Sequence, residues 1–146
     1  MSRPMPRSHR PSVDPRAIAA VMAGAVIGGP ARYALDQALP NSPEQFPWAT
    51  FTVNLTGSLA LGLLLVVVFE STWSVRHLRE FAGVGLLGSF TTFSTWMVEL
   101  REQAAASAWW VFALYLAGSL VLGLAAAALG ATAGRLAITR RRRRLR

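Results

Sequence analysis

The residues best suited to chemistry form a polar stretch in an otherwise apolar part of the chain, at residues 88–95. Glycines lead into this stretch and hydroxyl side chains fill it: Gly83, Gly85 and Gly88, then Ser89, Thr91, Thr92, Ser94 and Thr95. A single hydroxyl is tolerated in a membrane helix, where it bonds back to the carbonyl four residues earlier, but this combination weakens a helix over a continuous stretch. If the helix breaks here, its freed carbonyls need partners other than lipid, and such carbonyls readily coordinate a cation such as Na+.

A second polar pattern precedes it, in which Thr50, Asn54, Ser58 and Gly62 recur at every fourth position and so share one helical face. Asn54 is an amide deep in an apolar block, and its NH2 group can replace part of the hydration shell of an anion. A hydrogen bond between two helices is an equally common use of such an amide. The sequence alone leaves both interpretations open.

Two further pairs combine helical spacing with rings or hydroxyls. Phe93 and Trp96 are three residues apart, and Tyr115 and Ser119 are four apart, so each pair shares a face. The positive edge of an aromatic ring can favour an anion. Ordinary packing would explain the same pairs.

Charged side chains are scarce inside the apolar blocks. Arg32 is within the first block, where a charge must face protein or water. The nearby acids are expected near block ends: Asp36, Glu70, Glu80 and Glu99. A proton-coupled exporter usually needs a carboxylate at mid-span. Hydroxyls, an amide and an arginine instead favour an anion.

Other kinds of site have little support. The chain has no cysteine, which excludes disulfides and thiol metal sites, and its two histidines, His9 and His77, are isolated in polar segments. We find no motif for an enzyme.

Four apolar blocks must position these residues, at about 16–39, 48–69, 81–98 and 109–138. A block of 22 residues is roughly 33 Å long as a helix, enough to cross the hydrocarbon core of a bilayer. We therefore expect an all-α integral membrane protein with one four-span domain over residues 16–138, whose third span is broken at mid-membrane. A disordered basic tail at 1–15 and an Arg-rich tail at 139–146 are expected to flank it.

The arginines predict the orientation. All fifteen basic residues are arginine, and four spans place every one except Arg32 and Arg101 on the same side as both termini. The positive-inside rule then makes both termini cytoplasmic. The dense run at 140–144 could suggest nucleic acid, but beside a membrane span it favours anionic lipid headgroups, and no nucleic-acid partner is expected.

Three segments together resemble the bacterial fluoride channel family CrcB/Fluc, over residues 17–129. They are Gly28-Gly29-x-x-Arg32-Tyr33, then Thr52-x-Asn54-x-x-Gly57, then Gly88-Ser89-Phe90-Thr91-Thr92-Phe93-Ser94-Thr95 with Glu99. The resemblance implies a multi-pass protein of the bacterial plasma membrane that exports cytoplasmic fluoride passively and protects against its toxicity. It also implies an antiparallel dimer with a structural Na+ that is not transported.

The resemblance further assigns roles to single residues. It implies Na+ bound by the backbone carbonyls of Gly88 and Thr91, and Arg32 near a pore vestibule. The fluoride path would be lined by residues of three spans: Asn54, Phe93, Thr95, Trp96, Tyr115 and Ser119.

Two departures from the family pattern matter. The second aromatic ring is normally Phe, and Trp96 is larger with a stronger N–H donor, which predicts a pore that is altered, slowed or closed. The uneven arginines favour insertion in one orientation and hence a heterodimer with a partner of opposite bias. A homodimer stays open if insertion follows charge less strictly.

Two rival functions remain at this point. A small four-span exporter of cations or drugs predicts a mid-span carboxylate in the first span, which this chain lacks. A non-conducting partner subunit of a heterodimeric fluoride channel is the other, and the departure at Trp96 keeps it open.

Overall fold

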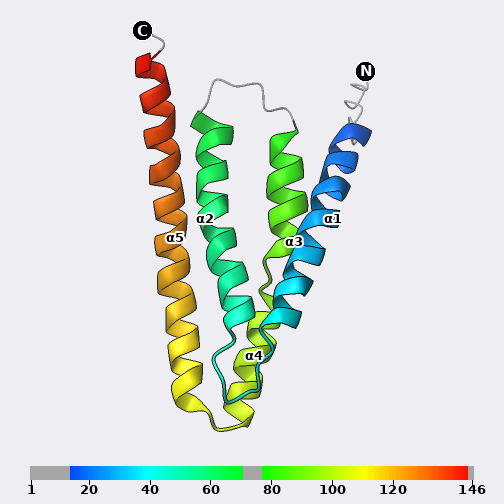
Figure 1. Cartoon of the computed structure of the whole chain (residues 1–146), viewed down its shortest axis with the longest axis vertical. Coiled ribbons are helices and arrows are strands. Elements are labelled where there is room, and N and C mark those ends of the chain that lie inside the picture. The colour runs from blue at the N-terminus through cyan, green and yellow to red at the C-terminus, as the bar shows by residue number, and fades with distance from the viewer. Residues whose placement is uncertain (1–13, 71–76, 145–146) are drawn as a thin grey trace, which may run out of the picture.

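The computed structural model describes residues 14–70 and 77–144, with side chains through Arg140, and within these ranges its regular structure is entirely helical. The elements are α1 (Pro15–Ala38), α2 (Trp48–Glu70), the π-helix η1 (Arg79–Leu87), α3 (Gly88–Phe90), α4 (Ser94–Ala105) and α5 (Trp109–Arg144). Figure 1 shows α5, α2, the third span and α1 side by side, with α4 at the end opposite both termini. Most of the basic tail expected at 1–15 lies outside the described residues.

Among the described residues, four helical segments are long and apolar enough to cross a membrane, which confirms the predicted class: Pro15–Ala38, Trp48–Glu70, Arg79–Ala105 and Trp109–Arg140. The expected break in the third segment is also confirmed, because residues 91–93 between α3 and α4 are not helical. Before the break the chain winds as a nine-residue π-helix, a rare form that often accompanies functional sites.

Two helix ends differ from the sequence-based boundaries. The helix of the third span continues to Ala105, so Glu99 lies further inside this helix than the sequence-based boundary at about residue 98 suggested. The polar residues after Glu99 suggested an end, but α4 continues through them and packs against α5. Helix α5 continues past residue 138 to Arg144, and its 36 residues measure roughly 54 Å. It therefore exceeds the hydrocarbon core, and its Arg-rich end projects beyond it.

Glycines bring the helices together in two close pairs. A Cβ on Gly24 of α1 would overlap the Phe81 carbonyl, and one on Gly85 of η1 would overlap the Val21 carbonyl. Between α2 and α5, a Cβ on Gly62 would overlap the Ala127 carbonyl. Small residues let membrane helices approach until their backbones touch. The α1–η1 and α2–α5 pairs are thus fixed by backbone contact, and a groove remains between them.

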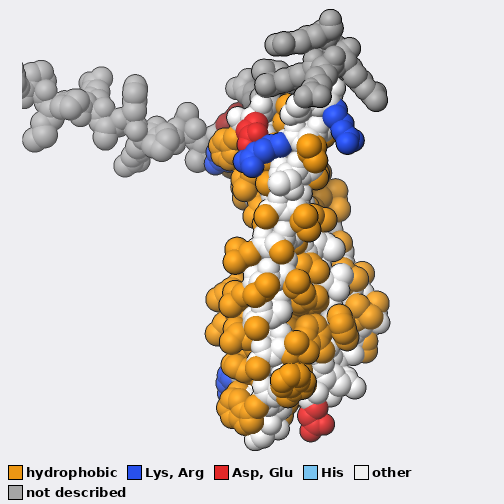
Figure 2. Space-filling model, turned by 90° about the vertical axis from the view of Figure 1, so that its left-hand side faces the viewer, with side chains coloured by type: hydrophobic (Ala, Val, Ile, Leu, Met, Phe, Trp, Pro, Cys, Tyr) orange, Lys and Arg blue, Asp and Glu red, His pale blue; other side chains and the backbone are white. Residues whose placement is uncertain are grey.

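The outward face of α5 suits a lipid environment. Figure 2 shows apolar side chains over this side of the molecule, with charged side chains gathered toward its two ends. Leu124 on α5 is 75% exposed and Trp110 is 79% exposed, values typical of side chains that face acyl chains.

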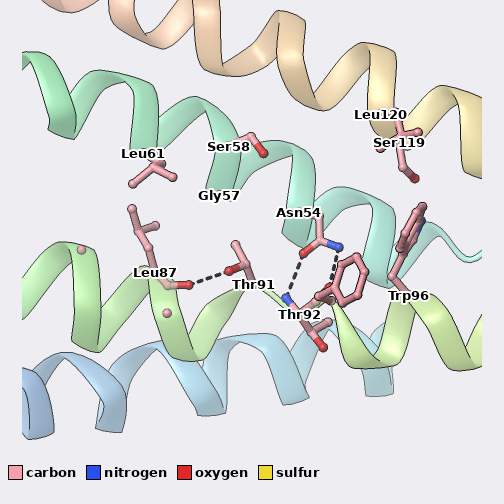
Figure 3. Close-up of a pocket in the computed structure, with 13 residues that line it drawn as sticks. Asn54, Gly57, Ser58, Leu61, Leu87, Thr91, Thr92, Trp96, Ser119 and Leu120 are labelled. Atoms are coloured by element: carbon pink, nitrogen blue, oxygen red, sulfur yellow. Dashed lines mark hydrogen bonds between the residues drawn. The ribbon is translucent and has the colours of Figure 1, made fainter.

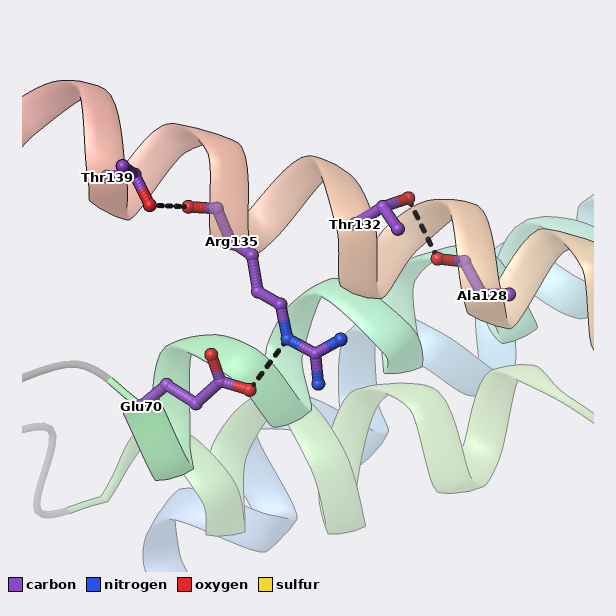
Figure 4. Close-up of polar contacts among 5 residues, drawn as sticks. All are labelled: Glu70, Ala128, Thr132, Arg135 and Thr139. Atoms are coloured by element: carbon purple, nitrogen blue, oxygen red, sulfur yellow. Dashed lines mark hydrogen bonds and ion pairs between the residues drawn. The ribbon is translucent and has the colours of Figure 1, made fainter.

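At the end near both termini, Arg135 of α5 donates from Nε to Glu70 Oε1 of α2 at 2.9 Å (Figure 4). Both side chains are largely exposed, and exposed ion pairs contribute about 0–1 kcal/mol. The same view shows Thr132 and Thr139 donating to the carbonyls of Ala128 and Arg135, four residues earlier on α5. These hydroxyls are satisfied by their own helix.

Candidate functional site

The break in the third span is held open by Asn54 of α2. The Thr92 N–H donates to Asn54 Oδ1 at 2.9 Å, and Asn54 Nδ2 donates to the Thr92 carbonyl at 2.8 Å (Figure 3). In a continuous α-helix the Thr92 N–H would bond to the Gly88 carbonyl. The Thr92 N–H therefore bonds to the Asn54 side chain in place of the Gly88 carbonyl.

The Thr92 side chain replaces a second helical hydrogen bond, about one turn later. The Thr95 N–H donates to Thr92 Oγ1 at 3.1 Å, whereas a continuous helix would direct it to the Thr91 carbonyl. The Thr91 carbonyl instead accepts a long bond of 3.4 Å from Arg32 Nη1 of α1. Asn54 and Thr92 thus release the two carbonyls, Gly88 and Thr91, that the family resemblance associates with Na+.

Acidic side chains do not provide a metal site in the described part of the chain, which contains no group of three or more His, Cys, Asp or Glu side chains suited to a metal ion. A cation at the break would depend on carbonyl oxygens, which are ligands that Na+ accepts in broken membrane helices.

A groove of about 390 Å³ lies beside the break, between α2, α5 and the third span. It brings together most of the predicted site residues: Asn54, Gly88, Thr91, Phe93, Trp96 and Ser119. Its wall is mainly apolar, and none of the described residues that line it is acidic or basic. The other lining residues are Gly57, Ser58, Leu61, Gly83, Leu87, Thr92 and Leu120. A neutral wall with a few convergent polar groups is the usual form of a small-ligand site.

Three predicted residues lie next to this groove without lining it. Arg32 reaches the Thr91 carbonyl from α1. Thr95 accepts from the Thr92 hydroxyl at 3.0 Å. Tyr115 is completely buried, and its ring centroid is 6.3 Å from that of Trp96.

Glu99 is the functional candidate that sequence reasoning missed. Its carboxylate accepts from the Thr50 hydroxyl at 2.8 Å and from the Tyr115 hydroxyl at 2.6 Å, which joins α2, α4 and α5. The four-residue spacing of polar side chains on α2 and α4 could have identified Glu99. Thr50 is four residues before Asn54 on its face, and Glu99 is four residues after Thr95. Polar side chains thus continue along the bundle from the groove toward the far end of α4.

Two serines on the groove differ from the other hydroxyls. Thr56 and Ser89 bond to carbonyls four residues earlier, at 2.6 and 2.7 Å. The Ser119 Oγ is buried and has no hydrogen-bond partner among the described residues. Ser58 and Ser119, with Asn54, also line a small cavity of about 30 Å³ between α2 and α5. The two residues therefore contribute to the walls of both spaces, while the Ser119 Oγ itself is buried.

The two aromatic side chains at the groove adopt different environments. The ring centroids of Phe93 and Trp96 are 5.5 Å apart, with the rings inclined at 43°. Phe93 is 72% exposed, while Trp96 is 8% exposed and packs in a cluster with Leu100 and Tyr115. An exposed apolar ring at mid-span is suited to contact with lipid or with another protein surface.

Comparison with known proteins identifies relatives over most of the chain. A family model described as CrcB-like protein, Camphor Resistance (CrcB), matches residues 19–131. Fluoride-specific ion channel FluC 3 of Streptomyces avermitilis is 49% identical over 124 residues, which are 85% of this chain and 61% of that protein. FluC 2 of Nocardia farcinica is 44% identical over 91% of this chain and 95% of its own length. FluC 1 of Mycobacterium tuberculosis is 38% identical over 80% and 88%. The chain thus spans less than two thirds of the Streptomyces protein but nearly all of the Nocardia one.

Proposed function

Because this chain belongs to the CrcB-like family, whose similar members are named fluoride-specific ion channels, we propose that it is a subunit of a fluoride-selective channel. The observation that supports this most is the neutral groove at the helix break, where hydroxyls and an amide converge without any acidic side chain. Such donors can replace the hydration shell of a small anion. The exporter alternative lacks support, because the one acid within α1 is Asp36, close to the helix end at Ala38.

Transport through this site is passive in our proposal. HF crosses membranes as a neutral molecule and ionises inside the cell, and a negative interior then drives the anion out. The membrane potential supplies about 2.3 kcal/mol per elementary charge per 100 mV. The chain's contribution is to lower the cost of removing water from fluoride inside the membrane. Catalysis plays no part in this proposal.

The experiment is fluoride release from liposomes that contain the full chain, followed with a fluoride electrode, with chloride release followed in parallel. We expect rapid fluoride release with little chloride release once a potassium ionophore dissipates the opposing potential. Protein-free liposomes give the background. Fluoride release at background level, from the chain alone and together with a partner subunit, would overturn the proposed function.

We further propose that a second four-span subunit packs against this chain in the opposite orientation. The hydroxyl and amide side chains that line the groove at mid-span support this, because polar groups inside a membrane are poorly suited to contact with lipid. The arginines favour a chain with both termini in the cytoplasm and its Arg-rich helix end against anionic headgroups, and hence a partner of opposite bias. In the liposome experiment, release only on co-reconstitution supports a heterodimer, and full release by the chain alone overturns it. Protease access to a C-terminal tag in intact cells would overturn the orientation.

A structural Na+ at the Gly88 and Thr91 carbonyls is part of the same proposal. Its support is that the helical donors of both carbonyls are bonded elsewhere, to Asn54 and to Thr92. Bound there, Na+ would neutralise the partial negative charge of these oxygens. Arg32 would then share the Thr91 carbonyl or give it up. Replacing Na+ by N-methylglucamine throughout the liposome experiment is expected to lower fluoride release severalfold, and unchanged release would exclude the ion.

A further inference from the structure

A second space lies between α2 and the third span, on the opposite side of this helix pair from the groove. Its volume is about 250 Å³, and every described side chain that lines it is apolar. This apolar pocket is lined by residues of both helices: Ala60, Leu63, Leu64 and Val67 on α2, and across from them Leu78, Ala82 and two leucines at the end of η1. At 3.6 residues per turn, its α2 residues lie roughly 120° around the helix from those that line the groove: Asn54, Gly57, Ser58 and Leu61. The two spaces therefore open on different sides of the molecule.

The apolar pocket opens toward the bilayer. Helix α2 meets η1 at Leu64 and Gly83, where a Cβ on Gly83 would lie 3.3 Å from the Leu64 side chain. The groove lies on one side of this contact and the apolar pocket lies on the other. The partner subunit proposed for the groove therefore leaves the side of the apolar pocket to lipid. Leu63, which lines this pocket, is 43% exposed and accessible to an acyl chain.

The depth of the apolar pocket matches the acyl region of one leaflet. On α2, Val67 is three residues and Ala60 ten residues from the helix end at Glu70, which are roughly 5 and 15 Å along the axis. Half of the hydrocarbon core of a bilayer is also about 15 Å thick. The end at Glu70 is the one near both termini (Figure 1). With both termini in the cytoplasm, the pocket belongs to the cytoplasmic leaflet.

A free cationic side chain lies at the headgroup end of this pocket. Arg79 directly follows Leu78, is exposed, and begins η1. No ion pair joins it to an acid within the described residues; the ion pair at this end is between Arg135 and Glu70. The neighbouring Glu80 does not neutralise it, because Glu80 Oε2 is buried and has no hydrogen-bond partner among the described residues. An arginine lays its aliphatic stem on apolar surface while its charged head extends to the interface.

We propose that the apolar pocket and Arg79 together bind one anionic phospholipid of the cytoplasmic leaflet. An acyl chain occupies the pocket and the lipid phosphate lies at the Arg79 guanidinium. Basic pockets between membrane helices on the cytoplasmic side bind anionic headgroups, and one arginine at the surface contributes about fivefold to that attraction. The acyl chain fills the space between α2 and the π-helix. It thereby steadies the segment that leads into the break at Gly88.

Photolabelling identifies what occupies the pocket. The full chain, in the assembly in which it purifies, is placed in liposomes that contain phosphatidylglycerol with a diazirine midway along one acyl chain. Labelled residues are mapped by mass spectrometry. We expect labelling at residues 60–67 and 78–87 to exceed that around Leu124, on the lipid-facing side of α5, by about fivefold. Equal labelling of the two surfaces would show ordinary lipid contact, and an unlabelled pocket would show that protein covers it; either result overturns the inference.

A charge variant tests the headgroup contact. Unlabelled phosphatidylglycerol should compete with the photolabel about fivefold better than phosphatidylcholine with the same acyl chains. Arg79→Gln, a change at an exposed side chain, should make the two lipids equal competitors. Arg140→Gln removes the same charge from α5 and is the matched control, which should keep the fivefold preference. A preference that survives Arg79→Gln, or that Arg140→Gln abolishes equally, would rule out a phosphate site at Arg79.

These measurements need no fluoride, so their outcome is separate from that of the channel proposal. Focused labelling together with background fluoride release retains the lipid site and removes the channel. Fluoride release together with even labelling removes the lipid site alone.

Discussion

Replacing Asn54 with leucine is expected to reduce fluoride release from liposomes by about a hundredfold or more, with the protein still folded in its four spans. Leucine has a similar volume but makes neither of the bonds that Asn54 makes to Thr92, at 2.8 and 2.9 Å. The freed Thr92 N–H can then return to the Gly88 carbonyl and continue the helix. Two lost bonds in a membrane interior amount to about 3 kcal/mol, enough for a hundredfold effect.

The control for this variant is Thr56→Val, also on α2. The Thr56 hydroxyl bonds to the Thr52 carbonyl of its own helix and lines neither the groove nor the small cavity. The Thr56→Val protein should release fluoride at a rate within about twofold of wild type. If the Asn54 variant keeps more than half of the wild-type rate, Asn54 does not hold the path open.

Replacing Gly62 with alanine should lower the free energy of unfolding by roughly 2 kcal/mol. A Cβ there would overlap the backbone carbonyl of Ala127, which cannot move without shifting α5. Helix propensity alone predicts the opposite sign, because alanine favours a helix by about 1 kcal/mol over glycine. The measurement is the midpoint of thermal unfolding in detergent.

Gly118→Ala on α5 is the matched control. A Cβ at Gly118 would lie 4.0 Å from the Phe51 ring, which is an ordinary contact. The unfolding midpoint of this variant should therefore equal that of wild type or lie slightly above it. Equal midpoints for the two variants would contradict the backbone contact between α2 and α5.

Much of the architecture could be predicted from the sequence, because hydropathy reports length and lipid contact directly. The break was predicted because glycines and hydroxyls follow one another there, and the structure locates it at residues 91–93. The π-helix before it could not be predicted. Its widened turns accompany the close approach of Gly24 and Gly85 across α1 and η1, a contact between segments far apart in the chain.

The site, too, could be predicted from the sequence only in part. Asn54 was open to two interpretations, and in the structure its amide bonds to the Thr92 backbone of the third span, which is the interhelical use. Glu99 was missed because a carboxylate next to Arg101 and Glu102 resembles the end of a span. Only the packing of α4 against α5 places it beside the Tyr115 hydroxyl. Composition reports where a side chain is tolerated, whereas its partners depend on tertiary structure.

The central claim is that fluoride passes along the groove beside the helix break, and an introduced thiol tests it most directly. The chain has no cysteine of its own, so Ser58→Cys places a single thiol on the groove and Leu124→Cys places one on the lipid-facing side of α5. We expect silver ion to stop fluoride release through the Ser58→Cys protein and to leave the Leu124→Cys protein unaffected. Undiminished release through Ser58→Cys, with its thiol shown by mass spectrometry to be fully occupied, would contradict the account.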